Sequence, residues 1–192
     1  MRADPIVRFQ RWFVAARRAG VPLPEAMALA TADARGRPAV RFVLLKQSDA
    51  QGFVFFTNAV SRKGRELDGR GTGALAFYWD AIGKQIRIEG RIEQMPAAAA
   101  DAYWATRPRA SQLAALASRQ SAPLANRGIL VRRWKSLTRR YAGKPVPRPT
   151  GWLGYRLIPD SIEFWTRHEH RLHHRELFVR TRRGWKQQLL QP

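Results

Sequence analysis

The chain of 192 residues contains no cysteine, which excludes disulfide bonds, thiolate metal sites and cysteine nucleophiles. It has no stretch close to the roughly 20 apolar residues that a membrane-spanning helix requires. The N-terminal residues also lack the uninterrupted apolar core of a signal peptide. These absences lead us to expect a protein of the cytoplasm with no membrane contact.

Acidic residues are scarce as well, because 14 Asp and Glu face 35 Lys and Arg, giving a formal net charge of +21. The scarcity of carboxylates disfavours a hydrolase whose active site uses two of them. The positive electrostatic field of the protein favours anionic partners. We find no glycine-rich phosphate loop of the P-loop or dinucleotide-binding type, and no recognition motif for nucleic acid. We therefore attribute the charge to an arginine-rich solvated surface and do not expect a nucleic-acid partner.

The pattern of apolar residues predicts a helix at residues 4–19, strands within 26–95, helices within 96–142 and strands again within 151–190. The first strands follow one another through short turns without long helical crossovers, which indicates an antiparallel barrel. No internal repeat or linker divides the chain. We predict one domain, residues 1–192, that is mainly β with peripheral helices (α+β class).

Two parts of this prediction specify strand boundaries closely. The apolar runs Phe42–Leu45 and Phe53–Phe56 are separated by a polar turn at Gln47–Gly52, an arrangement typical of a β-hairpin. The last part of the chain is predicted to hold four strands, at residues 152–158, 162–166, 176–180 and 185–190.

Cations and hydroxyl groups gather where the two apolar runs end. Ser61 is a suitable N-cap for a short helix, and Arg62 and Lys63 then fall in its first turn, where cations oppose the helix dipole. A phosphate bound among these cations and the free backbone amides would explain the arrangement. A solvated basic turn explains it equally well from composition alone.

A second polar cluster contains Tyr103, Arg107 and Ser111, whose spacing of four places them on one face of a continuous helix. Pro108 lies between them and is expected to interrupt that helix. An aromatic ring, a guanidinium and a hydroxyl together suit a phosphate attached to a planar ring. Exposed residues of an ordinary helix are an equal alternative.

All four histidines lie within residues 165–175. His168 and His170, with Glu169 between them, have the residue types of a metal site. The neighbouring arginines, among them Arg167 and Arg171, disfavour a bound cation, so we expect no metal. An anionic ligand, to which arginine offers planar bidentate contacts, and a solvated polar turn both remain compatible with the segment.

Taken in order, several segments resemble the pyridoxamine 5′-phosphate oxidase family, flavoproteins of the FMN-binding split-barrel fold. The matching segments are RFVLLK at 41–46, FFTN at 55–58, SRK at 61–63, Gln85, YWATRPRASQ at 103–112, SRQS at 118–121, GWLGYRL at 151–157 and EFW…RLHHR at 163–175. The resemblance covers nearly the whole chain. It implies an antiparallel FMN-binding split barrel and a homodimer with FMN at the subunit interface.

The resemblance also implies a role for individual residues. The FMN contacts would be Arg41, Phe42, Val43, Leu44, Leu45, Lys46, Phe56, Thr57, Arg62, Lys63, Gln85, Gln120, Ser121, Trp165 and Arg175. The substrate contacts would be Lys46, Tyr103, Arg107, Ser111, Arg171, Leu172 and His173. Of these, Arg171 and His173 would flank the pyridine ring at the reacting carbon and act in catalysis.

The implied reaction is the FMN-dependent oxidation of pyridoxine or pyridoxamine 5′-phosphate to pyridoxal 5′-phosphate, a step of vitamin B6 biosynthesis and salvage. O2 would be reduced to hydrogen peroxide, so the protein would be an oxidoreductase that accepts CH–NH2 donors. Two alternatives are a related split-barrel flavin oxidase acting on another aromatic substrate and a non-catalytic basic protein that binds flavin or nucleic acid. The chain departs from the family pattern at His174, where aspartate is usual, at Phe56, where tyrosine is common, and at residues 166–168, which are usually glycine-rich.

Overall fold

The computed structural model describes residues 4–192, in which nine strands form one antiparallel sheet that curls into a half-barrel. The strands are β1 (Ala26–Ala32), β2 (Pro38–Leu44), β3 (Gln47–Asp49), β4 (Gly52–Asn58), β5 (Thr72–Trp79), β6 (Lys84–Gln94), β7 (Trp152–Thr166), β8 (His174–Thr181) and β9 (Gly184–Leu190). The helices are α1 (Pro5–Arg18), α2 (Arg62–Arg70), α3 (Ala97–Thr106), α4 (Arg109–Ala117) and α5 (Arg127–Arg140), with short 3-10 turns at Asp80–Ile82 and Glu169–Arg171. The predicted fold class, an antiparallel split barrel with peripheral helices, is confirmed.

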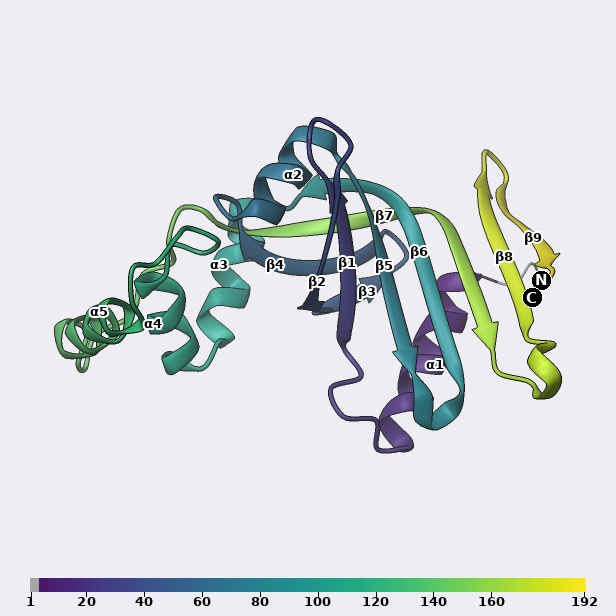
Figure 1. The fold of residues 1–192 in the computed structure, drawn as a ribbon, viewed down its shortest axis with the longest axis horizontal. Helices are drawn as coiled ribbons and strands as arrows, with labels where there is room; N and C mark the ends of the chain where they lie inside the picture. Colours follow the sequence, from purple (N-terminus) through teal and green to yellow (C-terminus); the bar gives the residue numbers. More distant parts are fainter. Residues whose placement is uncertain (1–3) are drawn as a thin grey trace.

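The order of strands across the sheet is β2-β1-β5-β6-β7-β4-β3, and the hairpin β8–β9 continues from β7. Helices α3–α5 gather at one end of the molecule and β8–β9 at the other (Figure 1). The strand β7 reaches both ends, because its first half pairs with β4 and its second half with β8. Within the described residues no helix has both the length and the apolarity to cross a bilayer.

The predicted hairpin between residues 42–45 and 53–56 is wrong. Strand β2 pairs with β1 along its whole length, whereas β4 pairs with β3, which forms from the first residues of the predicted turn. The two strands therefore lie near opposite edges of the sheet. The chain passes between them at Leu45 and Lys46, whose amides bond to Glu25 O beside β1 and to Val54 O in β4, respectively.

The segments predicted as two strands at 152–158 and 162–166 are one continuous strand, β7, with a bulge. Gly90 of β6 faces Pro159 and Glu89 faces Ser161, so Asp160 is an extra residue without an opposite partner. Such a bulge shifts the side-chain alternation by one residue. Gly90 also lacks a side chain where the strands approach closely, since a Cβ there would lie 2.1 Å from the Ile158 carbonyl oxygen.

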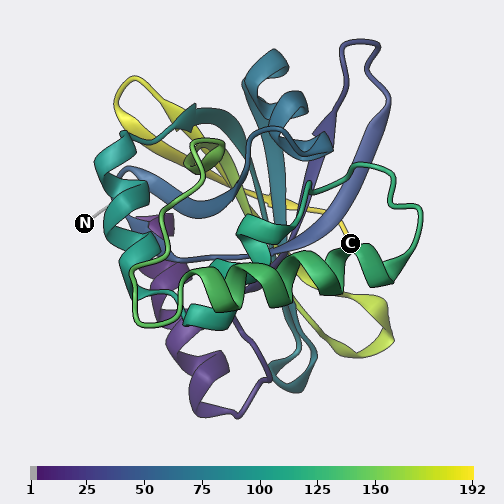
Figure 2. The same cartoon turned by 90° about the vertical axis from the view of Figure 1, so that its left-hand side faces the viewer.

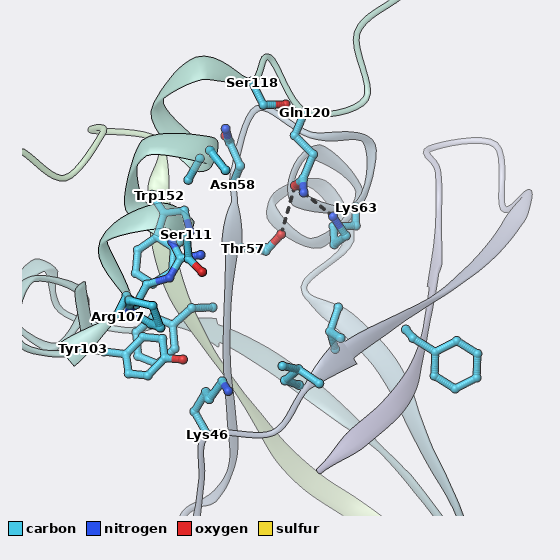
Figure 3. Close-up of a pocket in the computed structure, with 17 residues that line it drawn as sticks. Lys46, Thr57, Asn58, Lys63, Tyr103, Arg107, Ser111, Ser118, Gln120 and Trp152 are labelled. Atoms are coloured by element: carbon cyan, nitrogen blue, oxygen red, sulfur yellow. Dashed lines mark hydrogen bonds between the residues drawn. The ribbon is translucent and has the colours of Figure 1, made fainter. Parts of the chain in front are cut away.

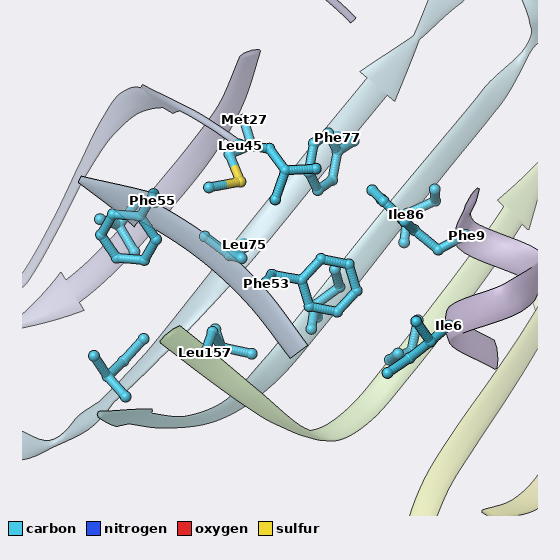
Figure 4. Close-up of a cluster of buried hydrophobic side chains, with 14 of the residues drawn as sticks. Ile6, Phe9, Met27, Leu45, Phe53, Phe55, Leu75, Phe77, Ile86 and Leu157 are labelled. Carbon is cyan, nitrogen blue, oxygen red and sulfur yellow. The ribbon is translucent and has the colours of Figure 1, made fainter. Parts of the chain in front are cut away.

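The main core fills the space between the curled sheet and helix α1 (Figure 4). Phe9 of α1 is fully buried, and its ring lies 4.8 Å from that of Phe53 and 5.1 Å from that of Phe77. The helix begins as predicted, because the Asp4 side chain accepts a hydrogen bond of 2.8 Å from the Ile6 amide. Burying each such aromatic side chain stabilises the fold by roughly 1.5–3 kcal/mol.

A second, smaller core attaches α3 and α4 to the start of β7. It consists of Trp104, Leu113, Val146 and Trp152, and the Trp104 indole donates a hydrogen bond of 2.8 Å to the Val146 carbonyl. Helix α5 lies across this end of the molecule (Figure 2) and packs on α4 without burying any of its own residues completely. It begins at Arg127 behind the Asn126 cap, within the predicted helical segment 96–142.

An ion pair connects the first helix to the C-terminal hairpin. Arg8 of α1 donates to the buried carboxylate of Glu176 in β8, which also accepts from Gln187 at 2.6 Å and lies 3.1 Å from the His174 imidazole. The hydrogen bond from Arg8 is the main cause that holds the pKa of Glu176 below its usual value. A lowered folded-state pKa means that the carboxylate stabilises the fold at neutral pH and loses this effect as the pH falls through that pKa.

We expect Glu176→Gln to lower the free energy of unfolding by about 1–3 kcal/mol at pH 7, because it removes a charge-assisted hydrogen bond to Arg8. The difference from the unmodified protein should shrink as the pH falls below about 4.5, the usual value for the group, where its own carboxyl becomes protonated. Urea unfolding at pH 7 and pH 3 measures both effects. The matched control is Glu93→Gln, which removes an exposed carboxylate that pairs with Arg91; a difference that stays constant with pH would contradict the prediction.

Candidate functional site

A pocket of about 630 Å³ opens between the last part of β4, the end of β2 and helices α3–α4 (Figure 3). Its size is that of a site for a small molecule or cofactor. It is lined by Phe42, Val43, Leu44, Lys46, Phe56, Thr57, Asn58, Lys63, Tyr103, Arg107, Pro108, Ser111, Ala114, Ala115, Ser118, Gln120 and Trp152. Predicted cofactor and substrate residues from distant segments of the sequence are thus brought together.

One side of the pocket is a cationic corner around Lys63. The Lys63 ammonium donates to Gln120 Oε1 at 3.0 Å, and Thr57 Oγ1 lies 3.4 Å from the same oxygen (Figure 3). Burial, aided by the nearby charge of Arg41, lowers the pKa of Lys63 from its usual value. A bound anion would stabilise two cations that lie close together in a buried place. This corner therefore suits a phosphate.

The Ser61 hydroxyl accepts from the Gly64 amide at 3.3 Å, which confirms it as the cap of α2. Arg41 and Arg62 do not line the pocket and lie behind this corner instead. Both bond to the buried carboxylate of Glu66, through Arg41 Nη2 at 3.1 Å and Arg62 Nε at 2.7 Å. Together with Lys63 they form one group of cations at the first turn of α2.

The other side of the pocket is aromatic. The rings of Tyr103, Phe56 and Trp152 are nearly parallel, with centroids 4.3 Å apart for Tyr103 and Phe56 and 5.3 Å apart for Phe56 and Trp152. Phe56, one of the residues that depart from the family pattern, stacks against both of the other rings. The Lys46 ammonium lies 5.7 Å from the centre of the Tyr103 ring. Such a wall suits a planar ligand with an anionic group.

Arg107 lies behind this aromatic wall, and its guanidinium is 4.7 Å from the centre of the Trp152 ring. Its Nη1 atom is buried and has no hydrogen-bond partner within the described residues. Burial also lowers the pKa of Arg107. Because a buried donor is normally paired, this atom indicates a missing anionic partner. Helix α3 ends at Thr106 and α4 begins at Arg109, so Pro108 does break the helix, yet Arg107 and Ser111 still line the same pocket.

The remaining predicted residues form a second group at the far end of β7. Gln85, Trp165 and Arg175 lie directly opposite one another on β6, β7 and β8, so their side chains share one face of the sheet. The His173 ring is 4.5 Å from that of Trp165. Arg171 has a positive φ of 61°, a strained conformation that is frequent at functional sites.

The two groups are far apart within one chain. Trp152 and Trp165 are separated by 13 residues of the same strand (165 minus 152), which corresponds to about 40 Å along the strand. A site that contains both groups requires a second copy of the chain.

Three predicted residues belong neither to the lining of the pocket nor to the facing residues at the far end of β7. Leu45 is buried in the main core with 6% exposure, Leu172 is exposed beside Arg171, and Ser121 has a positive φ of 69° in the exposed loop after Gln120. Two residues that depart from the family pattern have structural partners: Arg167 bonds to Asp80 and to the Tyr78 hydroxyl, and His174 bonds to Glu176.

Six lining residues were not predicted as site residues: Asn58, Pro108, Ala114, Ala115, Ser118 and Trp152. Asn58, Ser118 and Trp152 belong to the matching segments FFTN, SRQS and GWLGYRL, so the resemblance held the signal that would have found them. Small residues such as Ala114 carry no such signal. No group of three His, Cys, Asp or Glu side chains placed to hold a metal ion occurs within residues 4–192.

The curled antiparallel barrel and its cationic, aromatic pocket define a split-barrel protein of the flavin-binding class. Among solved structures, PhzG from Burkholderia lata 383, in complex with tetrahydrophenazine-1-carboxylic acid, superposes with a TM-score of 0.94 at 36% identity, covering 98% of this chain and 93% of that one. A pyridoxamine 5′-phosphate oxidase-related, FMN-binding protein from Nostoc punctiforme has the same fold, with a TM-score of 0.80 at 18% identity and full coverage of both chains.

Sequence comparison narrows the class to a family. Residues 13–141 match the model described as pyridoxamine 5′-phosphate oxidase, and residues 152–192 match that of the pyridoxine 5′-phosphate oxidase C-terminal dimerisation region. Pyridoxine/pyridoxamine 5′-phosphate oxidases from Rubrobacter xylanophilus and Myxococcus xanthus are 52% and 50% identical over 98% of this chain, covering 87% and 92% of those proteins. The chain belongs to the pyridoxamine 5′-phosphate oxidase family, whose enzymes use FMN.

If an anion binds at Arg107 Nη1, inorganic phosphate should bind there and stabilise the folded protein. We expect inorganic phosphate to raise the Tm of the unmodified protein and to raise that of Arg107→Met less, because a ligand stabilises only the form that binds it. Differential scanning fluorimetry over a phosphate titration, at constant ionic strength, measures both shifts. Arg91→Met, which removes an exposed arginine on β6, should respond like the unmodified protein; equal shifts in all three proteins would remove Arg107 from the anion site.

Proposed function

We propose that this protein oxidises pyridoxine 5′-phosphate or pyridoxamine 5′-phosphate to pyridoxal 5′-phosphate. Two electrons and a proton leave the C4′ carbon of the substrate as a hydride, the 4′ hydroxyl or amino group releases a second proton, and O2 takes up both electrons and two protons as hydrogen peroxide. With pyridoxamine 5′-phosphate the product of this oxidation is an imine, which water hydrolyses to the aldehyde and ammonia. FMN, when bound, supplies the redox chemistry by accepting the hydride and passing the electrons to O2. The observation that carries the proposal is the buried Arg107 Nη1 atom, which has no hydrogen-bond partner among residues 4–192. It lies in the same pocket as Tyr103 and Ser111, where it fits the phosphate of a substrate.

The residues present fit FMN. Lys63, with Arg41 and Arg62 behind it, offers clustered cations for its phosphate, and Gln120 and Thr57 add polar atoms at the same corner. The remaining cofactor contacts that we propose are the strand 42–46, Phe56, Ser121 and, from the far group, Gln85, Trp165 and Arg175. The protein thereby holds the planar cofactor against the wall of the pocket.

For the substrate we propose a separate set of contacts. Lys46, Tyr103, Arg107 and Ser111 bind the phosphate, which fixes the pyridine ring relative to the cofactor. Arg171 and His173 flank the ring, with Leu172 between them. The cationic Arg171 stabilises negative charge that develops next to the reacting carbon. The strained backbone at Arg171 supports such a functional position.

The active form that we propose is a homodimer with FMN at the subunit interface. Each chain contributes the pocket group to one site and the group at the far end of β7 to the other, as the separation of the two groups requires. Residues 152–192 match a dimerisation region, which supports this arrangement. Because β7 of that region pairs with β4 and β6, we treat residues 1–192 as one domain. We place the enzyme in the cytoplasm.

A second candidate is oxidation of another aromatic compound. It is favoured by the likeness to PhzG, whose structure holds tetrahydrophenazine-1-carboxylic acid, a ring system without phosphate. Against it stand the higher identity to pyridoxine/pyridoxamine 5′-phosphate oxidases and the presence of Lys46, Tyr103, Arg107 and Ser111 in one pocket. A carboxylate would pair with Arg107 Nη1 as a phosphate does, so the distinction rests on Lys46, Tyr103 and Ser111 in the same pocket and on the higher identity.

An aerobic assay of the FMN-loaded protein with pyridoxine 5′-phosphate tests the function directly, by following pyridoxal 5′-phosphate and peroxide. We expect stoichiometric formation of both products. In Arg171→Ala, kcat should fall by about 100-fold, the range for loss of one electrostatic contact to the transition state, while FMN affinity stays unchanged. Absence of product from the FMN-loaded protein would overturn the proposed reaction, and loss of FMN in Arg171→Ala would overturn the role of Arg171.

Mixing two inactive variants tests the shared sites. Arg107→Ala damages the pocket group and Arg171→Ala the far group, so a mixed dimer contains one site with both defects and one intact site. After unfolding and refolding an equimolar mixture, random pairing gives mixed dimers in half of the population and restores about a quarter of the full activity. Each variant refolded alone is the control. No recovery in the mixture would show that both groups act within one chain.

A further inference from the structure

The buried carboxylate of Glu66 places a negative charge beside the cationic corner around Lys63, where it would repel a bound anion. It projects from the second turn of α2 and its side chain is only 5% exposed. Its Oε1 accepts from Arg62 Nε at 2.7 Å, and its Oε2 accepts from Arg41 Nη2 at 3.1 Å and from the Thr31 hydroxyl at 2.5 Å. Both oxygens are therefore occupied, and both arginines belong to the cationic corner around Lys63.

These contacts fix how each arginine is presented. Arg41 is held from two sides, because its Nη1 also donates to the Leu29 carbonyl at 3.2 Å and to Thr31 Oγ1 at 2.5 Å. Arg62 is held through Nε alone, so its two Nη groups donate no hydrogen bond within residues 4–192 and remain free for a ligand. Without Glu66, two guanidinium groups and the Lys63 ammonium would repel one another at this corner.

We propose that Glu66 is a positioning residue that holds Arg41 and Arg62 in the arrangement that recognises the phosphate of the cofactor, and thereby makes the site prefer FMN to riboflavin. The inference rests on the proposed function, in which this corner binds the FMN phosphate. Glu66 does not touch the cofactor itself; it acts through the two arginines.

Two physical effects of Glu66 on phosphate binding have opposite signs, so they can be separated. As a bare charge, Glu66 repels a phosphate, and Glu66→Gln would then tighten FMN binding. As a positioning group it needs two acceptor oxygens, whereas glutamine has one acceptor and a donor NH2 that would face an arginine. Positioning therefore predicts weaker binding of the phosphorylated flavin and unchanged binding of the flavin without phosphate.

The experiment measures the Kd of FMN and of riboflavin for the flavin-free protein by quenching of flavin fluorescence. In Glu66→Gln we expect FMN to bind about tenfold more weakly, the effect of losing about one charge-assisted hydrogen bond, and riboflavin to bind as before. Glu66→Asp keeps the charge but is too short to reach both arginines, so FMN affinity should fall there too. Glu93→Gln, which removes the same charge from an exposed pair with Arg91, should change neither Kd.

Thermal unfolding of each flavin-free variant checks that the fold is retained, and Glu66→Asp serves where Glu66→Gln does not fold. Equal weakening of FMN and riboflavin would make Glu66 merely structural, and tighter or unchanged FMN binding would overturn the positioning role. An unmodified protein that binds FMN no better than riboflavin would instead overturn the phosphate site itself. Failure of this inference and failure of the proposed cofactor site are thus distinguishable.

Discussion

Buried carboxylates that each hold more than one basic side chain are the interaction on which the structure depends. Within residues 4–192, Glu66 holds Arg41 and Arg62, Glu163 holds Arg87 and Arg175, and Glu176 holds Arg8 together with the His174 imidazole. A buried charge is tolerated only where paired charges and hydrogen bonds compensate its loss of hydration. In a chain with a net charge of +21, acids are the rarer partner, and the buried ones stand beside site residues or join α1 to the last hairpin.

This arrangement explains how a strongly basic protein presents arginines to a small anion without losing their orientation. In the pocket group, Glu66 holds Arg41 and Arg62 behind the cationic corner. In the group at the far end of β7, the Glu163 carboxylate accepts from Arg175 at 2.7 Å beside Trp165. The two half-sites therefore share a design although they lie on different strands. In both, a buried carboxylate holds the guanidinium of a predicted cofactor contact in place.

Much of the fold follows from local patterns, and the errors have identifiable causes. The first helix and the Ser61 cap were predicted correctly because helical periodicity and capping act within a few residues. The hairpin of residues 42–56 was not, because nothing local distinguishes pairing with the next strand from a crossing to the opposite edge of the sheet. The resemblance, and not the spacing of residues, predicted that the site contains Lys63, Tyr103, Arg107 and Gln120. From spacing alone, solvent-exposed residues explained these clusters as well as a binding site did.

The bulge at Asp160 has a consequence for the site. Tyr155 and Leu157 point into the core before it, and Ile162 and Phe164 do so after it, so the core-facing positions change from odd to even numbers. Trp152 and Trp165 therefore both lie on the face of β7 that points away from the main core, although they are 13 positions apart. If the same residues alternated strictly along β7 without the bulge, Trp165 would instead lie on the face opposite Trp152 and point inward. The bulge in β7, as well as the identity of its residues, therefore determines which face of the sheet carries Trp165.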